Sequence, residues 1–478
     1  MAERAGQKIV VIGGGVAGLA AAYRLHELTA SHQFPIEVIL LEAGTRLGGA
    51  LETIRHGDCI LECGADSILS EKPQAIALAE RLGLGDQIVR TQEQFRKTFV
   101  VRGGKLIAIP DGFSLMAPAY IWPILKSPLF SVGGKLRMGL EPFIPRRQST
   151  DDESLASFVT RRLGREVLER VAQPLAAGIY TADPDKLSAT ATMPRFVEME
   201  RHYGSLVLGL RAAAKKRGAE ARGTSGARWS LFVSFRRGVT TLIDAIAARL
   251  GDDIRYNAEV RAISRTDSGW RIAMANGEPI NAAAVISAAP AAPVAQLVEP
   301  LDHALASNLA GIDYASAAVV NLIFRTADFP NPPASFGFVV PVSEKRKIVA
   351  GSFSSLKYAD RSPANLMVAR VFIGGALQSA MLTLDDDALI KAACEEFRAL
   401  LSVQAKPQFA HVRRWADSMP QYAVGHLERV KAIRERVATL PGFYLAGAYL
   451  DGVGIPDCVR HGETAAAAAF AHIRGPSA

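Results

Sequence analysis

Cysteine is scarce in this sequence, and its cysteines do not have the spacing of a metal site. The 478 residues include only four, which are Cys59, Cys63, Cys394 and Cys458. Because no histidine ligands accompany them, they exclude a zinc module, and we expect no metal. Reduced thiols of this kind are typical of a cytosolic protein.

Long apolar runs are also missing. None reaches the roughly 20 residues that a membrane-spanning helix needs, and residues 1–7 lack the apolar core of a signal peptide. We therefore expect a cytoplasmic chain that does not span a bilayer. The run Ala465–Ala469 is too short to change this view and fits a helix of a globular domain.

Charge is sparse and slightly positive. Charged residues make up 21% of the chain, and the formal net charge is +8. With 49% hydrophobic residues, the composition excludes a disordered chain, and the length predicts two or three domains. The basic surplus suits an anionic membrane surface or a substrate with carboxylates, whereas no aromatic and basic motif supports nucleic-acid binding.

The N-terminal stretch has the order of a dinucleotide-binding unit. An apolar strand at Lys8–Ile12 is followed by Gly13, Gly15 and Gly18 in a G-x-G-x-x-G pattern, and a second apolar run ends at Glu42. The glycines allow a tight turn, close approach of a pyrophosphate and close packing of helix on strand. The acid can accept hydrogen bonds from a ribose diol in either NAD or FAD.

The next loop favours FAD over NAD. Arg46 stands just before the pair Gly48 and Gly49, an R-x-G-G pattern that resembles the FAD-binding amine-oxidase-like superfamily. A guanidinium can neutralise phosphate charge, and paired glycines let a flavin approach backbone amides. A further glycine loop, Gly64–Ser67, occupies the position that lies beneath the flavin in that superfamily.

Four central stretches carry structural expectations. Asp111–Arg147 combines aromatic and apolar helical turns with basic residues; the pattern fits a membrane interface and, equally well, a lid over a substrate pocket. Asp152–Leu168 is predicted helical, with Asp152 or Ser154 as its cap. Arg211–Ser230 is predicted to be a solvated loop, and Ala288–Pro293 to break the chain at a domain junction.

The C-terminal part repeats the strand, glycine loop and helix order. Gly442–Ala469 contains a short strand ending near Gly447, a glycine-rich loop and a helix beginning near Cys458. If both ends of the chain hold one cofactor, the FAD domain is assembled from discontinuous segments.

Together these motifs resemble one family nearly end to end, the oxygen-dependent porphyrinogen oxidases of haem synthesis. The supporting segments are Gly13–Gly18, Arg46–Gly49, Asp152–Gly164, Pro174–Ser188, Met419–Leu427 and Gly452–Val459. The first two are shared with monoamine oxidases and carotenoid desaturases, and the others are more specific.

The resemblance implies an α/β fold with three parts. We expect a Rossmann-type FAD-binding domain from residues 1–92, 229–293 and 422–478. A mixed-sheet α+β substrate domain would use residues 93–110, 190–228 and 294–421, and a helical, membrane-associated subdomain residues 111–189.

The resemblance also implies the site. The expected FAD contacts are Gly13, Gly15, Gly18, Glu42, Arg46, Gly49, Gly64, Ala65, Asp66, Ser67, Val260, Trp415, Val453, Gly454 and Ile455. Gly178 matches a glycine whose carbonyl faces the macrocycle, and Asp66 matches a position near the substrate; these two are the candidate catalytic residues. The sequence offers no nucleophile–base arrangement, which fits chemistry carried by a flavin.

One departure concerns substrate binding. Where plant and animal protoporphyrinogen oxidases have an arginine for a propionate, this sequence has Thr98, with Lys97 beside it. The segments around Asp111–Pro118 and Leu129–Met138 resemble the branch that oxidises coproporphyrinogen III. We therefore expect that substrate, with overlapping activity on protoporphyrinogen IX and O2 as acceptor. The candidate partners are a membrane surface, a ferrochelatase and a second copy of the chain.

Other functions remain compatible with the shared motifs. An FAD-dependent amine oxidase or carotenoid desaturase would use the same nucleotide site, and a non-catalytic flavoprotein could bind porphyrin without oxidising its precursor. An NAD-dependent dehydrogenase has no use for the R-x-G-G loop or for the C-terminal glycine loop.

Overall fold

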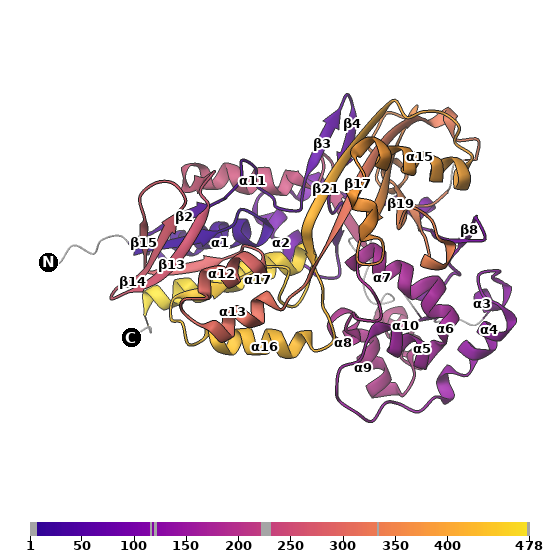
Figure 1. Cartoon of the computed structure of the whole chain (residues 1–478), viewed down its shortest axis with the longest axis horizontal. Helices are drawn as coiled ribbons and strands as arrows, with labels where there is room; N and C mark the ends of the chain where they lie inside the picture. Colours follow the sequence, from indigo (N-terminus) through magenta and orange to yellow (C-terminus); the bar gives the residue numbers. More distant parts are fainter. Residues whose placement is uncertain (1–6, 115–116, 119–121, 221–230, 332–333, 476–478) are drawn as a thin grey trace.

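The chain folds into three bodies that meet at the centre of the molecule. The computed structural model describes residues 7–114, 117–118, 122–220, 231–331 and 334–475. Helices α1 (Val16–His32) and α17 (Ile455–Arg474), from opposite ends of the sequence, lie in the left-hand body of Figure 1. The long strands β17 (Tyr314–Arg325) and β21 (Phe409–Pro420) run from the centre into the upper right body, and helices fill the lower right. The predicted α/β class with a discontinuous nucleotide-binding domain is confirmed.

A five-stranded parallel sheet forms the left-hand body, in the order β12-β2-β1-β16-β22. Its strands come from distant parts of the sequence and are β1 (Gln7–Ile12), β2 (Ile36–Leu41), β12 (Ile254–Arg255), β16 (Ala284–Ser287) and β22 (Phe443–Leu445). Because both faces of the sheet are covered, its central strands are almost uniformly apolar.

Alternate residues of these strands face two separate cores. Ile9 and Val11 pack with helices on one face, and Val10 and Ile12 pack with helices on the other. The first face is covered by α1 (Val16–His32), α11 (Thr240–Leu250) and α17 (Ile455–Arg474). The second is covered by α12 (Ala291–Val298), α13 (His303–Ala310), α16 (His426–Val437) and the antiparallel strands β13 (Val260–Thr266), β14 (Gly269–Met274) and β15 (Ile280–Ala282).

Smaller elements link this body to the rest of the chain. They are β3 (Thr53–His56), β4 (Cys59–Glu62), β5 (Ile68–Leu69), α2 (Gln74–Arg81), η1 (Gly85–Gln87), β6 (Ile88–Arg90), η2 (Glu93–Phe95), β11 (Phe232–Phe235) and η5 (Gly251–Asp253).

A seven-stranded mixed sheet forms the upper right body, in the order β21-β17-β20-β19-β18-β7-β8. The strands are β7 (Thr98–Arg102), β8 (Lys105–Ala108), β17 (Tyr314–Arg325), β18 (Gly337–Val339), β19 (Ala350–Phe353), β20 (Leu366–Gly374) and β21 (Phe409–Pro420). Helix α15 (Asp386–Leu401) packs on the outer face, and Asp385 caps it by accepting from the Ala388 N–H at 2.8 Å. The short elements η6 (Thr326–Asp328), η7 (Val342–Glu344), α14 (Ser354–Lys357) and η8 (Ser379–Thr383) join the strands.

The lower right body is helical. Its elements are β9 (Phe113–Ser114), β10 (Ala117–Pro118), α3 (Trp122–Lys126), α4 (Val132–Gly139), η3 (Glu141–Phe143), α5 (Leu155–Leu163), α6 (Arg165–Val167), the π-helical turn η4 (Leu168–Ala172), α7 (Gln173–Tyr180), α8 (Ala189–Thr192), α9 (Pro194–Tyr203) and α10 (Leu206–Glu220). Ser154 caps α5 by accepting from the Ser157 N–H at 3.1 Å, which decides between the two predicted caps. Residues 116 and 120 of the predicted interface segment lie outside the described residues.

Two local predictions were wrong. The predicted loop Arg211–Ser230 is helical up to Glu220, and 221–230 lie outside the described residues. The predicted breaker at Ala288–Pro293 runs directly into α12, because Pro290 is the N-cap and Pro293 falls in the first turn, where a helix needs no N–H.

These findings bear on the domain boundaries. Since α12 and α13 pack on the parallel sheet, we propose that this domain continues to about residue 312 and does not end at 293. Likewise, α9 and α10 share the core of the helical body, so we propose that this body includes residues 190–220, which the sequence had assigned to the substrate domain.

Candidate functional site

The glycine turn after β1 is built for close approach. The Gly13 N–H donates to the Leu41 carbonyl at 2.8 Å, and Gly13 has a φ of +103°. A Cβ on Gly18 would overlap the Gly13 carbonyl oxygen, whereas a Cβ on Gly15 would meet nothing within 4 Å. Gly18 therefore serves the packing of α1 on β1, and Gly15 leaves open space at the helix start.

The carboxylate of Glu42 stands beside this turn. One oxygen accepts from the Gly14 N–H at 2.7 Å and the other from the Gly44 N–H at 2.7 Å. Each oxygen keeps a further lone pair for a ligand hydroxyl. The Ala258 N–H donates to the Glu42 carbonyl at 2.9 Å, which brings the segment leading to Val260 to the same edge.

Arg46 holds the R-x-G-G loop in shape. Its guanidinium donates to the carbonyls of Leu47 at 2.8 Å and Leu51 at 2.7 Å, and also to the Gly49 carbonyl. The side chain predicted to meet a phosphate is thus engaged with the loop itself. The structure gives it a role in shaping the loop, and its contact with FAD stays a prediction.

The Gly64–Ser67 loop is fixed from several sides. A Cβ on Gly64 would overlap the Ala50 carbonyl oxygen, and the Trp415 indole N–H donates to the Cys63 carbonyl at 2.6 Å. Ala65, in contrast, is exposed. The loop therefore presents a small, accessible backbone surface over a rigid support.

Asp66 lies among cations. Its carboxylate pairs with the Lys357 Nζ at 2.9 Å and with Arg370 Nη1 at 2.9 Å, and the Ser67 hydroxyl donates to it at 2.7 Å. Burial raises the pKa of Asp66, but the charges of Lys357 and Arg370 outweigh burial and hold that pKa well below its usual range. An ionised, paired carboxylate is a poor proton acceptor, so the geometry favours an electrostatic role for Asp66.

The helices that follow the C-terminal and N-terminal glycine loops pack against each other. Gly454 is the N-cap of α17, which begins at Ile455, and α17 packs against α1 so closely that a Cβ on Gly462 would overlap the Ala17 carbonyl oxygen. Val453 packs against the core of the helical body. The predicted contacts Val453–Ile455 therefore lie where the nucleotide-binding and helical bodies join.

These features fit a dinucleotide. Helix α1 starts at a glycine without a side-chain cap and has no acid in its first turn, so its N–H groups are available to an anion. Helix α17 also starts at an uncapped glycine, but its first turn contains Pro456, which has no N–H, and Asp457. Gly15 is open, and Gly49 and Ala65 are exposed. The turn can hold a diphosphate, Glu42 a ribose, and the two exposed loops a flat ring system.

The inner face of the seven-stranded sheet lies above this cradle. Cross-strand register puts Asn321, Arg370, Ser352, Gly337 and Thr98 in one row. The next row is apolar and consists of Val319, Phe372, Ala350, Val339 and Val100.

Gly178 of α7 faces the apolar row. A Cβ at this glycine would lie 3.9 Å from the Val339 side chain, and both Gly178 and Ile179 are exposed. An exposed glycine and an exposed aliphatic side chain at the junction of two bodies leave room for a flat apolar ligand. Gly178 and Thr98 are thus brought to the same sheet face.

Lys97 does not share this face with Thr98. Side chains alternate along an extended chain, and Thr98 lies on the side of Val100, which packs with the helical body. Lys97 is exposed and on the side of Phe99, which packs with the outer core beneath α15. The alternation favours Thr98 over Lys97 as a substrate contact.

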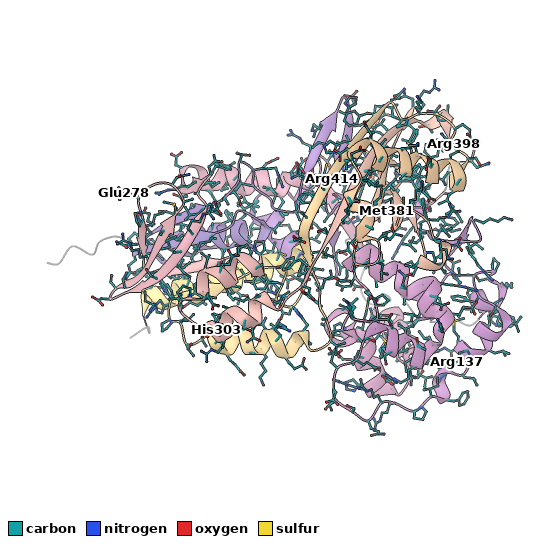
Figure 2. All side chains as sticks on the ribbon, in the orientation of Figure 1. Arg137, Glu278, His303, Met381, Arg398 and Arg414 are labelled. Atoms are coloured by element: carbon teal, nitrogen blue, oxygen red, sulfur yellow. The ribbon has the colours of Figure 1, made fainter. Side chains whose placement is uncertain are left out.

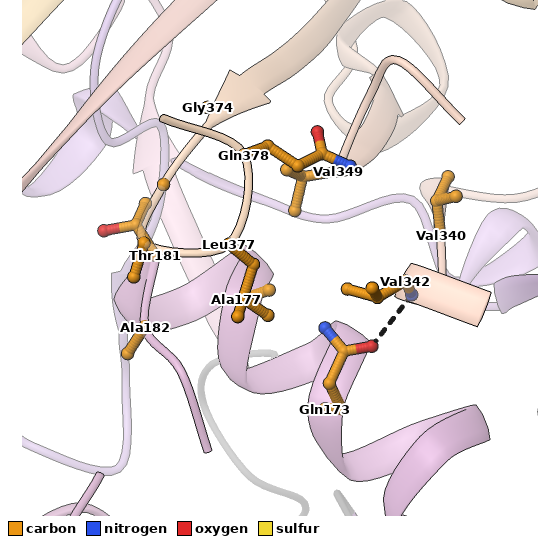
Figure 3. Close-up of a pocket in the computed structure, with 12 residues that line it drawn as sticks. Gln173, Ala177, Thr181, Ala182, Val340, Val342, Val349, Gly374, Leu377 and Gln378 are labelled. Carbon is orange, nitrogen blue, oxygen red and sulfur yellow. Dashed lines mark hydrogen bonds between the residues drawn. The ribbon is translucent and has the colours of Figure 1, made fainter. Parts of the chain in front are cut away.

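A small pocket lies beside α7 (Gln173–Tyr180). It is lined by Ala177, Thr181 and the loop 374–378, and Gln173 accepts from the Val342 N–H at 3.0 Å (Figure 3). None of the predicted FAD contacts lines it. We assign the pocket no part in the cofactor site.

Two kinds of feature are absent from the described residues. No cluster of three or more His, Cys, Asp or Glu side chains in the described ranges could hold a metal ion. Within the same ranges, no helix combines the length and apolar character needed to cross a membrane.

Sequence reasoning missed Lys357 and Arg370. Arg370 lies in the apolar strand Leu366–Gly374, and a single charge within such a run is the signal that could have drawn attention to it. Lys357, at the end of a short helix, gave no such signal. Both residues contact a loop that is distant in the sequence: Lys357 is 291 residues from Asp66, and Arg370 is 306 residues from Gly64.

Comparison with protein families agrees with the site. The model of the family described as flavin-containing amine oxidoreductase matches residues 16–469. The coproporphyrinogen III oxidase of Bacillus subtilis (strain 168) is 32% identical over 467 residues, covering 97% of this chain and 98% of its own. The protoporphyrinogen oxidase of Homo sapiens is 30% identical, covering 96% of this chain and 98% of its own.

Solved structures extend the comparison. A crystal structure of an Exiguobacterium protein, described as a candidate protoporphyrinogen oxidase, matches with a TM-score of 0.85 and 30% identity and covers 98% of this chain and 99% of its own. A putrescine oxidase variant matches with a TM-score of 0.70 at 16% identity, covering 97% of this chain and 99% of its own. At that identity the second likeness concerns the fold alone.

Proposed function

Because the chain belongs to the flavin-containing amine oxidoreductases and, within them, to the porphyrinogen oxidase family, we propose that it oxidises a porphyrinogen with bound FAD and O2, releasing hydrogen peroxide. The observation that carries the proposal is the similarity to coproporphyrinogen III oxidase over 97% of this chain, which includes the segments around Gly178 and Val453. An amine oxidase is supported by the broad family model and by a shared fold at 16% identity.

The chemistry needs little from the side chains beyond positioning. FAD, when bound, supplies the two-electron oxidation of a methylene bridge, repeated three times for a complete porphyrin. In this proposal Gly13, Gly15 and Gly18 hold the diphosphate and Glu42 the ribose. Gly178 and the apolar row of the sheet orient the macrocycle and exclude water, with the Gly178 carbonyl accepting from pyrrole N–H groups.

We propose coproporphyrinogen III as the preferred substrate. It carries four carboxylates, which agrees with the basic surplus of the chain. The support is the similarity to coproporphyrinogen III oxidases, of which a second, from Propionibacterium freudenreichii subsp. freudenreichii, is also 32% identical. Thr98 is the proposed neutral contact at the position where an arginine binds a propionate in the plant and animal relatives.

The test compares two substrates on the FAD-loaded protein. Oxygen-dependent growth of porphyrin fluorescence is measured with coproporphyrinogen III and protoporphyrinogen IX, and each is expressed as kcat/KM. We expect the larger value for coproporphyrinogen III. Anaerobic mixing with either porphyrinogen should bleach the flavin; a protein that binds without bleaching is a binder, and oxidation of amines alone would indicate an amine oxidase.

We also propose that the helical body contacts the cytoplasmic face of a membrane. Large apolar side chains are exposed there, with Trp122 74%, Val132 75%, Leu136 68% and Phe143 81% exposed. Lys126 and Lys135 lie among them. Apolar side chains with flanking basic residues suit an anionic interface. A ferrochelatase and a second copy of the chain remain proposed partners.

A further inference from the structure

Arg370 connects the substrate sheet to the cofactor loop. Its side chain is 2% exposed, and its guanidinium pairs through Nη1 with Asp66 at 2.9 Å. Through Nη2 it also donates to the Gly64 carbonyl. One side chain of β20 therefore holds both the backbone and the carboxylate of the loop that carries four predicted FAD contacts.

A second connection runs in parallel. The Lys357 Nζ donates to Asp66 at 2.9 and 3.1 Å, and the neighbouring Tyr358 hydroxyl donates to the Ser67 hydroxyl at 2.7 Å. The Lys357 side chain is 15% exposed. The Gly64–Ser67 loop is therefore gripped by α14 and β20 of the sheet body, although it belongs to the nucleotide-binding body by sequence.

The charges in this cluster do not cancel. Asp66 is ionised, and it faces two cations, Lys357 and Arg370, so the cluster carries one excess positive charge. A second acid, Glu62, also interacts electrostatically with Arg370, but burial raises its pKa, and its carboxyl group already lies 3.7 Å from buried Arg361 and accepts from the Val239 N–H at 2.9 Å. A buried surplus of charge is costly unless a partner compensates it.

We propose that Arg370 and Lys357 are positioning residues for the flavin. They fix the Gly64–Ser67 loop, and their surplus positive charge favours the more electron-rich, reduced flavin and so raises its reduction potential. The inference rests on the proposed cofactor site, and nothing in it depends on which porphyrinogen is oxidised. Positive charge placed where negative charge develops is a common source of stabilisation.

The test measures the midpoint potential and the FAD dissociation constant of substrate-free protein. Arg370→Met should lower the potential and weaken FAD binding by about tenfold or more, because hydrogen bonds to a charged group are lost. Arg370→Lys should keep the potential near that of the unaltered protein but bind FAD less tightly, since it cannot hold Gly64 and Asp66 together. Asp66→Asn should shift the potential upward, opposite to Arg370→Met.

Two further variants keep the inference falsifiable. Lys357→Met removes the more exposed cation and should lower the potential even if Arg370→Met fails to fold. Arg162→Met is the matched control: Arg162 is also fully buried and paired with a carboxylate, but in the helical body. It should lower thermal stability and leave the potential unchanged.

The outcomes separate this inference from the proposed function. A potential that is unmoved in Lys357→Met and Arg370→Met, or that moves in the same direction in Asp66→Asn, would overturn the inference. An equal shift in Arg162→Met would do the same. An unaltered protein that does not bind FAD at all would instead defeat the proposed function.

Discussion

The nucleotide-binding body and the α3–α4–η3 segment use apolar and charged residues in opposite ways. In α1, Leu19 and Leu25 are fully buried against the sheet. In α4, Leu136 is exposed, while the charged Arg137 on the same helix turns inward and donates to the carbonyls that end α5. Figure 2 shows Arg137 within the helical body, at the lower right of the molecule.

Contacts with carboxylates fix α4 and η3 of this segment. Glu166 accepts from the Ser131 N–H at 2.9 Å at the start of α4. At the far end, buried Glu141 pairs with Arg162 and accepts from the Leu206 N–H at 2.8 Å. The segment is therefore fixed by polar contacts on its inner side, which leaves its apolar side chains free for a partner. Folding and the proposed partner binding therefore rest on different residue classes in the two regions.

The largest effect is expected at the glycine turn. Gly18→Ala should cost at least about 4 kcal/mol, in the range of exceptional substitutions, because its Cβ overlaps the Gly13 carbonyl oxygen. Gly15→Ala is the matched control, since its φ of −73° suits alanine and no atom lies near the added carbon. It should keep the urea midpoint of the apoprotein and lose FAD affinity. Equal stability losses in both variants would contradict the separate roles of the two glycines.

The next effect tests the ionic support of the helical body. Arg162→Met should destabilise the protein by about 3–5 kcal/mol, because it leaves Glu141 buried without its cation. Adding Glu141→Gln should restore part of that loss, as a double-mutant cycle in urea would measure. If the two single losses simply add, the pair does not act as a unit.

The two regions also differ in how far the sequence predicts them. The turn at Gly13 and the acid at Glu42 follow from local patterns, and the structure has them where expected. Helix α10 was missed because its Lys, Arg, Ala and Gly residues show no apolar period, although its start is stabilised by Glu141, a residue of another element. Tertiary contacts of this kind override local propensity.

The same limit applies to the site. Glycine spacing predicts a cradle because each glycine has a local backbone reason, and the close packing predicted at Gly18 is confirmed. Gly64 is close to the Ala50 carbonyl, and its approach to a ligand stays a prediction. The pairing of Asp66 with Lys357 and Arg370 depends on how β20 is seated over the loop, which no local pattern encodes. The sequence therefore does not predict that Arg370 is buried against this loop, although it does show that Arg370 lies within an apolar strand.

A smaller effect is expected on acidification. The pKa of Asp66 is lowered in the folded protein, so its ion pairs stabilise the fold above the unfolded-state pKa of about 4 and are lost as the pH falls through the lower folded-state value. The urea midpoint of the unaltered protein should therefore fall between pH 5 and pH 3, and that of Asp66→Asn should fall less. Glu200 in the helical body has a pKa lowered by Arg161 against the effect of burial, so Glu200→Gln should show the same sign. Parallel curves for Asp66→Asn and the unaltered protein would exclude a contribution from Asp66.

The smallest effect on stability is expected in the α3–α4–η3 segment, where large apolar side chains are exposed to solvent. Leu136→Ser and Phe143→Ser should each change the free energy of unfolding by no more than about 0.5 kcal/mol, because both side chains are already exposed to water. Leu25→Ser, the same change on a fully buried leucine of α1, should cost several times more. On vesicles containing anionic lipid the order reverses: the double variant Leu136→Ser, Phe143→Ser should bind about tenfold or more weakly, since two apolar side chains no longer leave water. If the double variant sediments with vesicles as well as the unaltered protein does, a membrane is not the partner of this face. A protein would then be the remaining candidate partner, because the fold itself does not require these apolar side chains to be exposed.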